Sequence, residues 1–333
     1  MIYGYIGLIA FLLAVFLSPV SIKISERLNI FSKPARGELK GKPCLGGIAI
    51  YIGFILACAS AWFLYRGVSF PKITGLVVSS SLMILLGLVD DVKNLRPFIK
   101  IIVELIATSF LILFGIFTRI SFLPMWLNIL ITFIWVLAIT NAFNLLDIVD
   151  GLSAGLVIIV SSTFLIISLV NRDVISSIAL VSLIGAHLGF LRYNYPPAKL
   201  YMGDTGSLFS GFLLAALAIN ISYAPLERPV ALIAPILAMS LPIYDTIFLI
   251  IMRAKKRKPI FSKTNDHFAL RLVTMGYSIR ESIWIMYSFS IFLAILSLML
   301  AFSSNAIGIV VLMVAFLVFI FMGKKVGMVN VDD

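Results

Sequence analysis

The sequence predicts an all-α protein that crosses a membrane many times. Hydrophobic residues make up 61% of its 333 residues and charged residues only 12%, which is more apolar sequence than one soluble core could bury. Runs of mostly uncharged residues recur along the whole chain, each long enough to cross a hydrocarbon core of roughly 30 Å as a helix. We therefore expect one transmembrane catalytic domain over residues 1–333 with eleven spanning helices.

The first run lacks a basic n-region and a small-residue cleavage site, and its first cation, Lys23, follows it. It is therefore expected to remain as a helix rather than to be a cleaved signal. In chain order, the expected spans are 2–22, 46–65, 72–89, 98–117, 123–141, 154–171, 174–191, 207–223, 230–252, 280–301 and 305–322.

The distribution of cations predicts the orientation of these spans. With eleven spans, 21 of the 26 Lys and Arg residues fall on one side of the membrane, and Lys and Arg concentrate in cytoplasmic loops. This places the N-terminus outside and the C-terminus in the cytoplasm. The net charge of +11 then lies mainly on the cytoplasmic face, where it attracts anionic lipids or substrates. It does not by itself indicate nucleic acid.

Six aspartates lie toward the same cytoplasmic side. A single Asp just past a helix end is as readily a solvated surface residue as a functional one, but five carboxylates at three helix ends form a pattern that solvation does not explain. A carboxylate within an apolar span needs a partner or a water-filled cavity. The six are Asp90 and Asp91 after the third span, Asp147 and Asp150 after the fifth, Asp204 at the start of the eighth, and Asp245 in the ninth.

The stretch "NAFNLLDIVDG" carries four polar residues at intervals of three. These are Asn141, Asn144, Asp147 and Asp150, ending at Gly151. On a helix surface, residues three apart are neighbours, so we expect a polar stripe that lines one wall of a cleft. The alternative role for the two Asn side chains is to bond neighbouring helices.

Carboxylates at this density repel one another and need compensation. Mg²⁺ is an economical partner, because it typically uses one or two carboxylates together with waters and substrate phosphate oxygens. Neighbouring cations, Lys100 among them, supply the other half of a phosphate site. "MGDTGS" adds a helix start able to aim backbone donors at an anion.

Two basic loops complete the expected cytoplasmic cleft. Residues 32–47 form either an ordered lid over a charged ligand or a basic linker. In residues 253–279, Lys255 to Lys258 serve as a positive-inside anchor. His267 and Arg271 come later in that loop, and His267 is either a phosphate donor, an acid–base group or a surface residue. The cleft is expected near 23–45, 90–100, 141–153, 192–207 and 253–279.

In this order, "VDDVKN", "NAFNLLDIVDGLSAG", "YMGDTGSLFSG", "PIYDT" and "KTNDHFALRL" resemble the polyprenyl-phosphate N-acetylhexosamine-1-phosphate transferases. This is a glycosyltransferase 4 type of family, related to the phospho-MurNAc-pentapeptide translocases. The resemblance covers nearly the whole chain. It implies transfer of a sugar 1-phosphate from a UDP-sugar to polyprenyl (undecaprenyl) phosphate with release of UMP. It also implies dependence on Mg²⁺ or Mn²⁺, the cytoplasmic membrane as location, and a homodimer.

The resemblance also assigns roles to residues. Asp204 is expected to be the metal ligand, Tyr201 to stack on uracil, and Asp150 to contact the uridine. Asp90 and Asp91 match an aspartate pair that handles the lipid phosphate and metal. Asn144 and the catalytic Asp147 are expected to line the nucleotide-sugar site, with Lys100, His267 and Arg271 as further substrate-binding residues.

Three segments depart from the family pattern. Ile148 stands where the family often has glycine, and Ala269 and Leu270 replace two histidines of the common His-x-His-His-Arg pattern. In the first loop, "SKPA" replaces the usual Asp-Lys-Pro-Asn. Because the late loop bears on sugar recognition, the donor is left open between N-acetylglucosamine and another N-acetylhexosamine.

The chemistry predicts an in-line displacement in which Asp90 orients the lipid phosphate or removes a residual proton. A covalent aspartyl-phosphate at Asp90 or Asp91 is the alternative. Three other kinds of protein are alternatives: an ion-coupled transporter, a CDP-alcohol phosphatidyltransferase, and an inactive scaffold. No internal repeat supports the first. The Ala-Arg and Asp-x-x-x-Asp that the second requires are missing after "DIVDG", and the complete carboxylate set opposes the third.

Overall fold

The computed structural model describes residues 2–32, 41–64, 70–223, 227–257 and 266–329. Within them helices are the regular secondary structure, with one isolated bridge between Phe31 and Pro43, which confirms the predicted all-α class. Much of the expected lid (33–40) and of the second basic loop (258–265) lies outside the described residues. The chain forms two compact units, Met1–Ser222 and Tyr223–Asp333.

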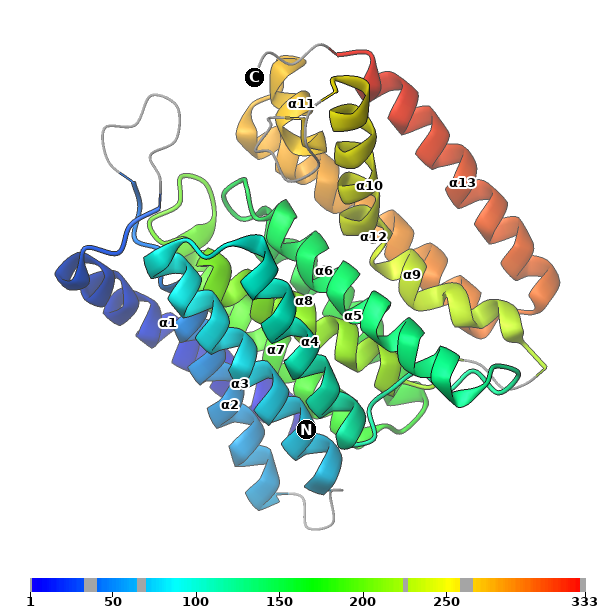
Figure 1. The fold of residues 1–333 in the computed structure, drawn as a ribbon, viewed down its shortest axis with the longest axis horizontal. Coiled ribbons are helices and arrows are strands. Elements are labelled where there is room, and N and C mark those ends of the chain that lie inside the picture. The colour runs from blue at the N-terminus through cyan, green and yellow to red at the C-terminus, as the bar shows by residue number, and fades with distance from the viewer. Residues whose placement is uncertain (1, 33–40, 65–69, 224–226, 258–265, 330–333) are drawn as a thin grey trace. The chain divides into compact units, whose positions relative to one another are not determined.

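Unit 1 contains eight helices that correspond to the first eight expected spans (Figure 1). Helix α8 is its central element, because it contacts α2, α3, α5 and α6 and every residue from Thr205 to Ala218 is buried. The eight are α1 (Ile2–Leu28), α2 (Gly46–Leu64), α3 (Phe70–Lys93), α4 (Pro97–Leu113), α5 (Met125–Leu146), α6 (Leu152–Val170), α7 (Val174–Asn194) and α8 (Gly203–Asn220).

A glycine in α3 allows the start of α8 to approach closely. A Cβ atom added to Gly87 would lie 2.4 Å from the Thr205 Cα and 2.5 Å from the Asp204 carbonyl oxygen, so no larger residue fits without moving the helices apart. Small residues at helix contacts let backbones come together within membranes, where apolar burial alone does not drive helix association. Gly87 thereby sets the distance between the carboxyl end of α3 and the first turn of α8.

Unit 2 contains 3-10 helix η1 (Pro229–Ile233) and helices α9 (Ala234–Ala238), α10 (Ser240–Lys255), α11 (Phe268–Thr274), α12 (Ile279–Phe302) and α13 (Asn305–Gly327). The single helix expected over 230–252 was wrong, because the chain bends by 70° between Pro229–Ala238 and Ser240–Lys255. Pro242 has no N–H to donate to the Ala238 carbonyl, and this interrupts the helix. The short helix α11 was not predicted.

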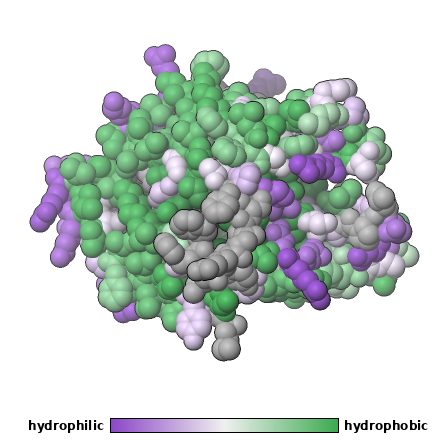
Figure 2. Space-filling view, turned by 90° about the horizontal axis from the view of Figure 1, so that it is seen from below, coloured by the Kyte–Doolittle hydropathy of each residue, from purple (hydrophilic) through white to green (hydrophobic). Residues whose placement is uncertain are grey.

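The structure confirms a polytopic membrane protein. Among the described residues, seven helices are long and apolar enough to cross a membrane, or eight if the bent pair is one span; eleven spans and the orientation of the termini stay predictions. Large apolar side chains cover much of the surface in Figure 2, and Phe16 and Leu113 are 70% and 79% exposed. The seven are α1, α3, α5, α6, α7, α12 and α13.

We expect the substitution Gly87→Ala to destabilise the protein by about 1–3 kcal/mol, because the added methyl group overlaps the α8 backbone. Thermal unfolding in detergent, followed by intrinsic fluorescence, measures this as a lowered Tm. Gly4→Ala in α1 is the matched control, since a Cβ there meets nothing within 4 Å. Equal Tm values for the two variants would contradict the proposed close approach.

Candidate active site

Three helix ends in unit 1 bring charged residues together. Asp90 and Asp91 lie in the last turn of α3, Lys100 in the first turns of α4, and Asp204 in the first turn of α8. A short link, closed by a hydrogen bond from the Asn94 N–H to the Asp90 carbonyl (2.8 Å), joins α3 to α4, and α3 packs along α8. The fold therefore assembles residues that are more than a hundred positions apart in the sequence.

The Lys100 ammonium group bridges two carboxylates. Its Nζ lies 2.7 Å from Asp204 Oδ2 and also forms an ion pair with Asp90 Oδ2. The second Asp90 oxygen, Oδ1, accepts a hydrogen bond from the Leu95 N–H at 2.6 Å, and Asp90 is only 5% exposed. Both oxygens of Asp90 are therefore held by donors, which fixes the orientation of its carboxylate.

Asp91 has a different environment from its neighbour Asp90. Its carboxylate accepts hydrogen bonds from the Asp204 N–H (2.8 Å), the Thr205 N–H (3.1 Å) and the Thr205 hydroxyl (2.6 Å). It thus caps the N-terminus of α8 from another helix, where a negative charge is also favoured by the helix dipole. Gly203 permits this contact, because a Cβ there would lie 2.6 Å from Asp91 Oδ2 and its φ is +69°.

The expected polar stripe was only partly right. Helix α5 ends at Leu146 and Asp147 leaves helical geometry (φ −78°, ψ 59°), so Asp147 and Asp150 lie in the turn before Gly151 rather than on the helix. The helix expected to break at Gly151 ends earlier, at Leu146; Gly151, with a φ of +77°, is instead the residue that precedes α6. On the helix itself, Asn144 donates from Nδ2 to Ser207 Oγ at 2.9 Å.

Asp147 is half-buried and, among the described residues, forms no hydrogen bond through its side chain. Burial, followed by the negative charges of Asp204, Asp91 and Asp150, raises the pKa of its carboxyl group to about 8. The Asp147 carboxyl group therefore lies within electrostatic range of all three carboxylates. This cluster has more negative charge than its own cations offset.

A second group of contacts surrounds Asp150. Its Oδ2 accepts a hydrogen bond from the Ala198 N–H at 2.8 Å and lies 3.5 Å from Lys42 Nζ. Lys42 Nζ also lies 5.2 Å from the centre of the Tyr201 ring, a distance at which the cation is attracted to the ring face. The Tyr201 N–H donates to the Pro43 carbonyl (2.8 Å), which ties the first loop to this ring.

Two expected site residues lie in unit 2. His267 Nδ1 is 2.9 Å from Asp245 Oδ2, and the Phe268 N–H donates to Asp245 Oδ1 at 2.7 Å, so the buried Asp245 has the partner that its apolar surroundings require. Arg271 is fully buried. It donates to Asp266 (2.7 Å) and to the Val326 (3.3 Å) and Val329 (2.6 Å) carbonyls near the end of α13, where a cation is favourable.

Two carboxylates that share one cation fit a Mg²⁺ site. Among the described residues, no group of three His, Cys, Asp or Glu side chains could hold a metal, which excludes a closed cage built from those residues. Mg²⁺ does not need one, because one or two carboxylates, waters and substrate phosphate oxygens complete its shell. Asp204 and Asp90 are the pair that meets this description.

Comparison with known proteins now identifies the family. The model of glycosyl transferase family 4 matches residues 73–222. A probable undecaprenyl-phosphate N-acetylglucosaminyl 1-phosphate transferase of Bacillus subtilis (strain 168) is 30% identical over 334 residues, which cover 97% of this chain and 92% of that protein. The chain belongs to glycosyl transferase family 4. Family membership confirms the resemblance seen in the motifs.

Other relatives fall into two groups. A decaprenyl-phosphate N-acetylglucosaminephosphotransferase of Mycolicibacterium smegmatis is 28% identical over 85% of this chain and 78% of that protein. A phospho-N-acetylmuramoyl-pentapeptide-transferase of Desulforamulus reducens is 33% identical over 62% of this chain and 70% of that protein. The chain is accordingly an enzyme of the phospho-sugar transferase type, and the transporter alternative is set aside.

The family match covers every expected site residue of unit 1, from Asp90 to Asp204. Sequence reasoning did not single out two further residues near them. Lys42 was counted only as part of a basic loop. Glu104, buried in α4, accepts a hydrogen bond from Asn141 Nδ2 at 2.7 Å; as the lone acid in an apolar run, it carried a signal that should have marked it.

The substitutions Asp91→Ala and Asp147→Ala should shift stability in opposite directions. Loss of the Asp91 cap leaves N–H groups of α8 without an acceptor and should cost about 1–2 kcal/mol. Folding raises the pKa of Asp147, so at neutral pH this carboxyl group must take up a proton when the chain folds, which lowers stability. Loss of Asp147 removes this cost, so the Tm should stay unchanged or rise. Both are measured by thermal unfolding in detergent, and a larger loss for Asp147→Ala would refute these assignments.

Proposed function

We propose that this enzyme transfers N-acetylglucosamine 1-phosphate, or the 1-phosphate of another N-acetylhexosamine, from a UDP-sugar to polyprenyl phosphate. The products are a polyprenyl-diphospho-sugar and UMP, and the reaction is the first membrane step of a cell-envelope glycan. The names of the Bacillus and Mycolicibacterium relatives support the acceptor and the sugar. The predicted orientation places this chemistry on the cytoplasmic face of the cell membrane, and a homodimer remains a prediction.

The observation that carries the proposal is the bridge from Lys100 to both Asp90 and Asp204. It fixes an ammonium group beside two carboxylates where three helices end, and this combination can bind a phosphate together with its metal ion. We assign Asp204 as the metal ligand. Mg²⁺ bound there would neutralise charge on the diphosphate and on the departing UMP.

The reaction proceeds as one in-line displacement. An oxygen of the lipid phosphate forms a bond to the sugar-bearing phosphorus, and the bond from that phosphorus to the UMP oxygen breaks. The lipid phosphate has a second pKa near 6, so it is largely dianionic at neutral pH and needs little help from a base. Lys100 offsets the repulsion between the two anions, and Asp90 holds Lys100 in position.

The carboxylate of Asp90 is better placed to orient than to attack. Both of its oxygens already accept from donors, the Leu95 N–H and the Lys100 ammonium group, and these contacts reduce its nucleophilicity. Asp91 is saturated by three donors from α8, which makes it a positioning residue. The surroundings of both aspartates therefore argue against a covalent aspartyl-phosphate.

The Lys42, Asp150 and Tyr201 group is the proposed uridine site. The Tyr201 ring offers a stacking surface for a base, and Asp150 can accept hydrogen bonds. Lys42 already lies over one face of that ring. A stacked uracil must therefore use the other face or displace Lys42. Asn144, which bonds Ser207 of α8, and Asp147, which lies within electrostatic range of Asp204, are proposed to contact the sugar diphosphate.

UMP release by purified protein should require a UDP-N-acetylhexosamine, undecaprenyl phosphate and Mg²⁺, and should be abolished by EDTA or by Asp204→Ala. The substitution Lys100→Met should lower kcat/KM by about 100-fold or more, because it removes charge stabilisation from the transferred phosphoryl group. Lys93→Met is the matched control, since Lys93 is an exposed cation at the end of α3. A Lys100→Met variant with the same kcat/KM as Lys93→Met would contradict the proposed role of Lys100.

The substitution Asp90→Asn should retain more than about a tenth of wild-type turnover above pH 8, where the lipid phosphate is fully ionised. An amide cannot replace a nucleophilic carboxylate, so a covalent route predicts no turnover. As a second readout, enzyme incubated with donor labelled in the sugar-bearing phosphate, without acceptor, should carry no label after quenching. A labelled chain that loses its label in Asp90→Asn would establish the covalent route instead.

A further inference from the structure

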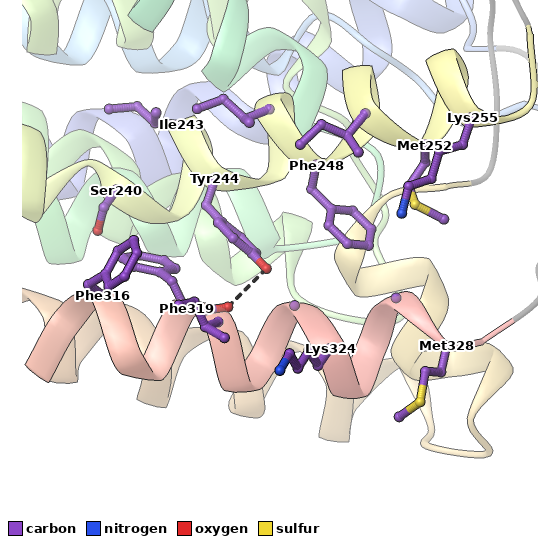
Figure 3. A pocket seen from close by; sticks show the side chains of 15 residues that line it. Ser240, Ile243, Tyr244, Phe248, Met252, Lys255, Phe316, Phe319, Lys324 and Met328 are labelled. Atoms are coloured by element: carbon purple, nitrogen blue, oxygen red, sulfur yellow. Dashed lines mark hydrogen bonds between the residues drawn. The ribbon is translucent and has the colours of Figure 1, made fainter.

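Unit 2 contains a groove whose lining includes none of the residues assigned above to sugar transfer. It lies between α10 and α13 and has a volume of about 850 Å³ (Figure 3), within the size range of small-molecule sites. Its walls are mostly apolar. They are formed largely by Ile243, Ile247 and Phe248 from α10 and by Phe316, Phe319 and Ile320 from α13.

Fixed contacts shape the floor of the groove. The Tyr244 hydroxyl donates to the Phe319 carbonyl at 3.3 Å, and the two rings lie 4.8 Å apart, which ties α10 to α13. Two glycines of α13 leave room beside these rings. A Cβ at Gly323 would lie 2.4 Å from the Tyr244 oxygen, and one at Gly327 would contact Phe248 at 3.7 Å. Glycine at these two positions therefore lets the Tyr244 and Phe248 side chains of α10 lie against α13.

The charge in the groove is confined to one end. Lys255 and Lys324 lie in the last turns of α10 and α13, and both line the groove (Figure 3). No acidic residue lies among the described residues that line it. Both lysines are exposed and neither pairs with a carboxylate of the described chain. An apolar channel that ends in two ammonium groups is complementary to a hydrocarbon chain with an anionic head.

We propose that this groove binds one acyl chain of an anionic glycerophospholipid, with its phosphate beside Lys255 and Lys324. From Ser240 to Lys255 the groove follows α10 for about 22 Å at the helical rise, longer than the roughly 15 Å from headgroup to bilayer midplane. Only 17% of the apolar 18-residue window of α13 is buried, and this exposed helix gives the acyl chain access from the membrane. The lysines supply the attraction for an anionic head.

A second copy of this chain fits the groove less well. A two-fold interface places the same patch on both subunits, so it would bring four lysine side chains into one interface, while no described lining residue of the groove is acidic, and such an excess of like charge is costly. A phospholipid places a phosphate there instead. The charge pattern thus favours lipid over self-association.

Native mass spectrometry of the detergent-purified full chain, titrated with phosphatidylglycerol or with phosphatidylcholine of the same acyl chains, tests the headgroup. We expect one phosphatidylglycerol molecule to bind tightly and phosphatidylcholine to bind more weakly. The substitution Lys324→Gln should weaken phosphatidylglycerol binding about fivefold. Lys325→Gln is the control, because the neighbouring, exposed Lys325 does not line the groove. Equal losses for both variants would show non-specific surface charge and overturn the proposal.

A second pair of variants tests the acyl chain. Ile320→Trp should fill the groove and weaken phosphatidylglycerol binding at least about fivefold, whereas Leu317→Trp should not, because Leu317 is 64% exposed outside the groove. No difference between them would place the lipid elsewhere. Displacement of phosphatidylglycerol by an equal amount of undecaprenyl phosphate would assign the groove to the acceptor lipid. A wild-type dimer that Ile320→Trp converts to monomer would assign it to a second copy.

Discussion

The hydrogen bonds from the start of α8 to the Asp91 carboxylate are the constraint on which the site depends. Helix α8 is the buried centre of unit 1, and its first N–H groups have no acceptors within the helix. Asp91 supplies these acceptors from α3. The same contacts fix the backbone of Asp204, so one capping interaction holds both the start of the central helix and the backbone that carries the Asp204 side chain.

Around the start of α8, some carboxylates have a cation beside them and others do not. Lys100 offsets Asp90 and Asp204, and Lys42 lies beside Asp150, but Asp147 has no such partner among the described residues. Two anionic substrates entering this cleft would meet surplus negative charge. The arrangement is workable if a divalent ion arrives with the donor, which is the usual situation for Mg²⁺ bound through substrate phosphates. In this proposal the protein positions and orients the two substrates, and the divalent ion that arrives with the donor neutralises the surplus carboxylates.

Sequence reasoning succeeded where a rule depends on local pattern. Apolar runs located the helices, and the alternation of the spans across the membrane put the helix ends that carry Asp90, Asp147 and Asp204 on one side. Sequence reasoning failed where contacts between distant segments determine the partner of a side chain. Nothing local distinguishes Asp91 from Asp90, yet Asp91 caps another helix while Asp90 bonds Lys100. Likewise, the three-residue spacing suggested a helix through Asp150, but Asp147 departs from helical geometry, and Pro242 broke a span that hydropathy showed as continuous.

Asp204, whose backbone is held by Asp91 and whose carboxylate is bridged to Asp90 by Lys100, is proposed to bind the metal ion of the donor complex. Electron paramagnetic resonance of Mn²⁺, titrated into the full protein with UDP-N-acetylglucosamine, measures this without turnover. We expect a bound Mn²⁺ signal with the wild-type chain and its loss with Asp204→Ala, while Asp173→Ala, at the opposite end of unit 1's spans, leaves it unchanged. A bound signal of the same strength in Asp204→Ala would contradict the account.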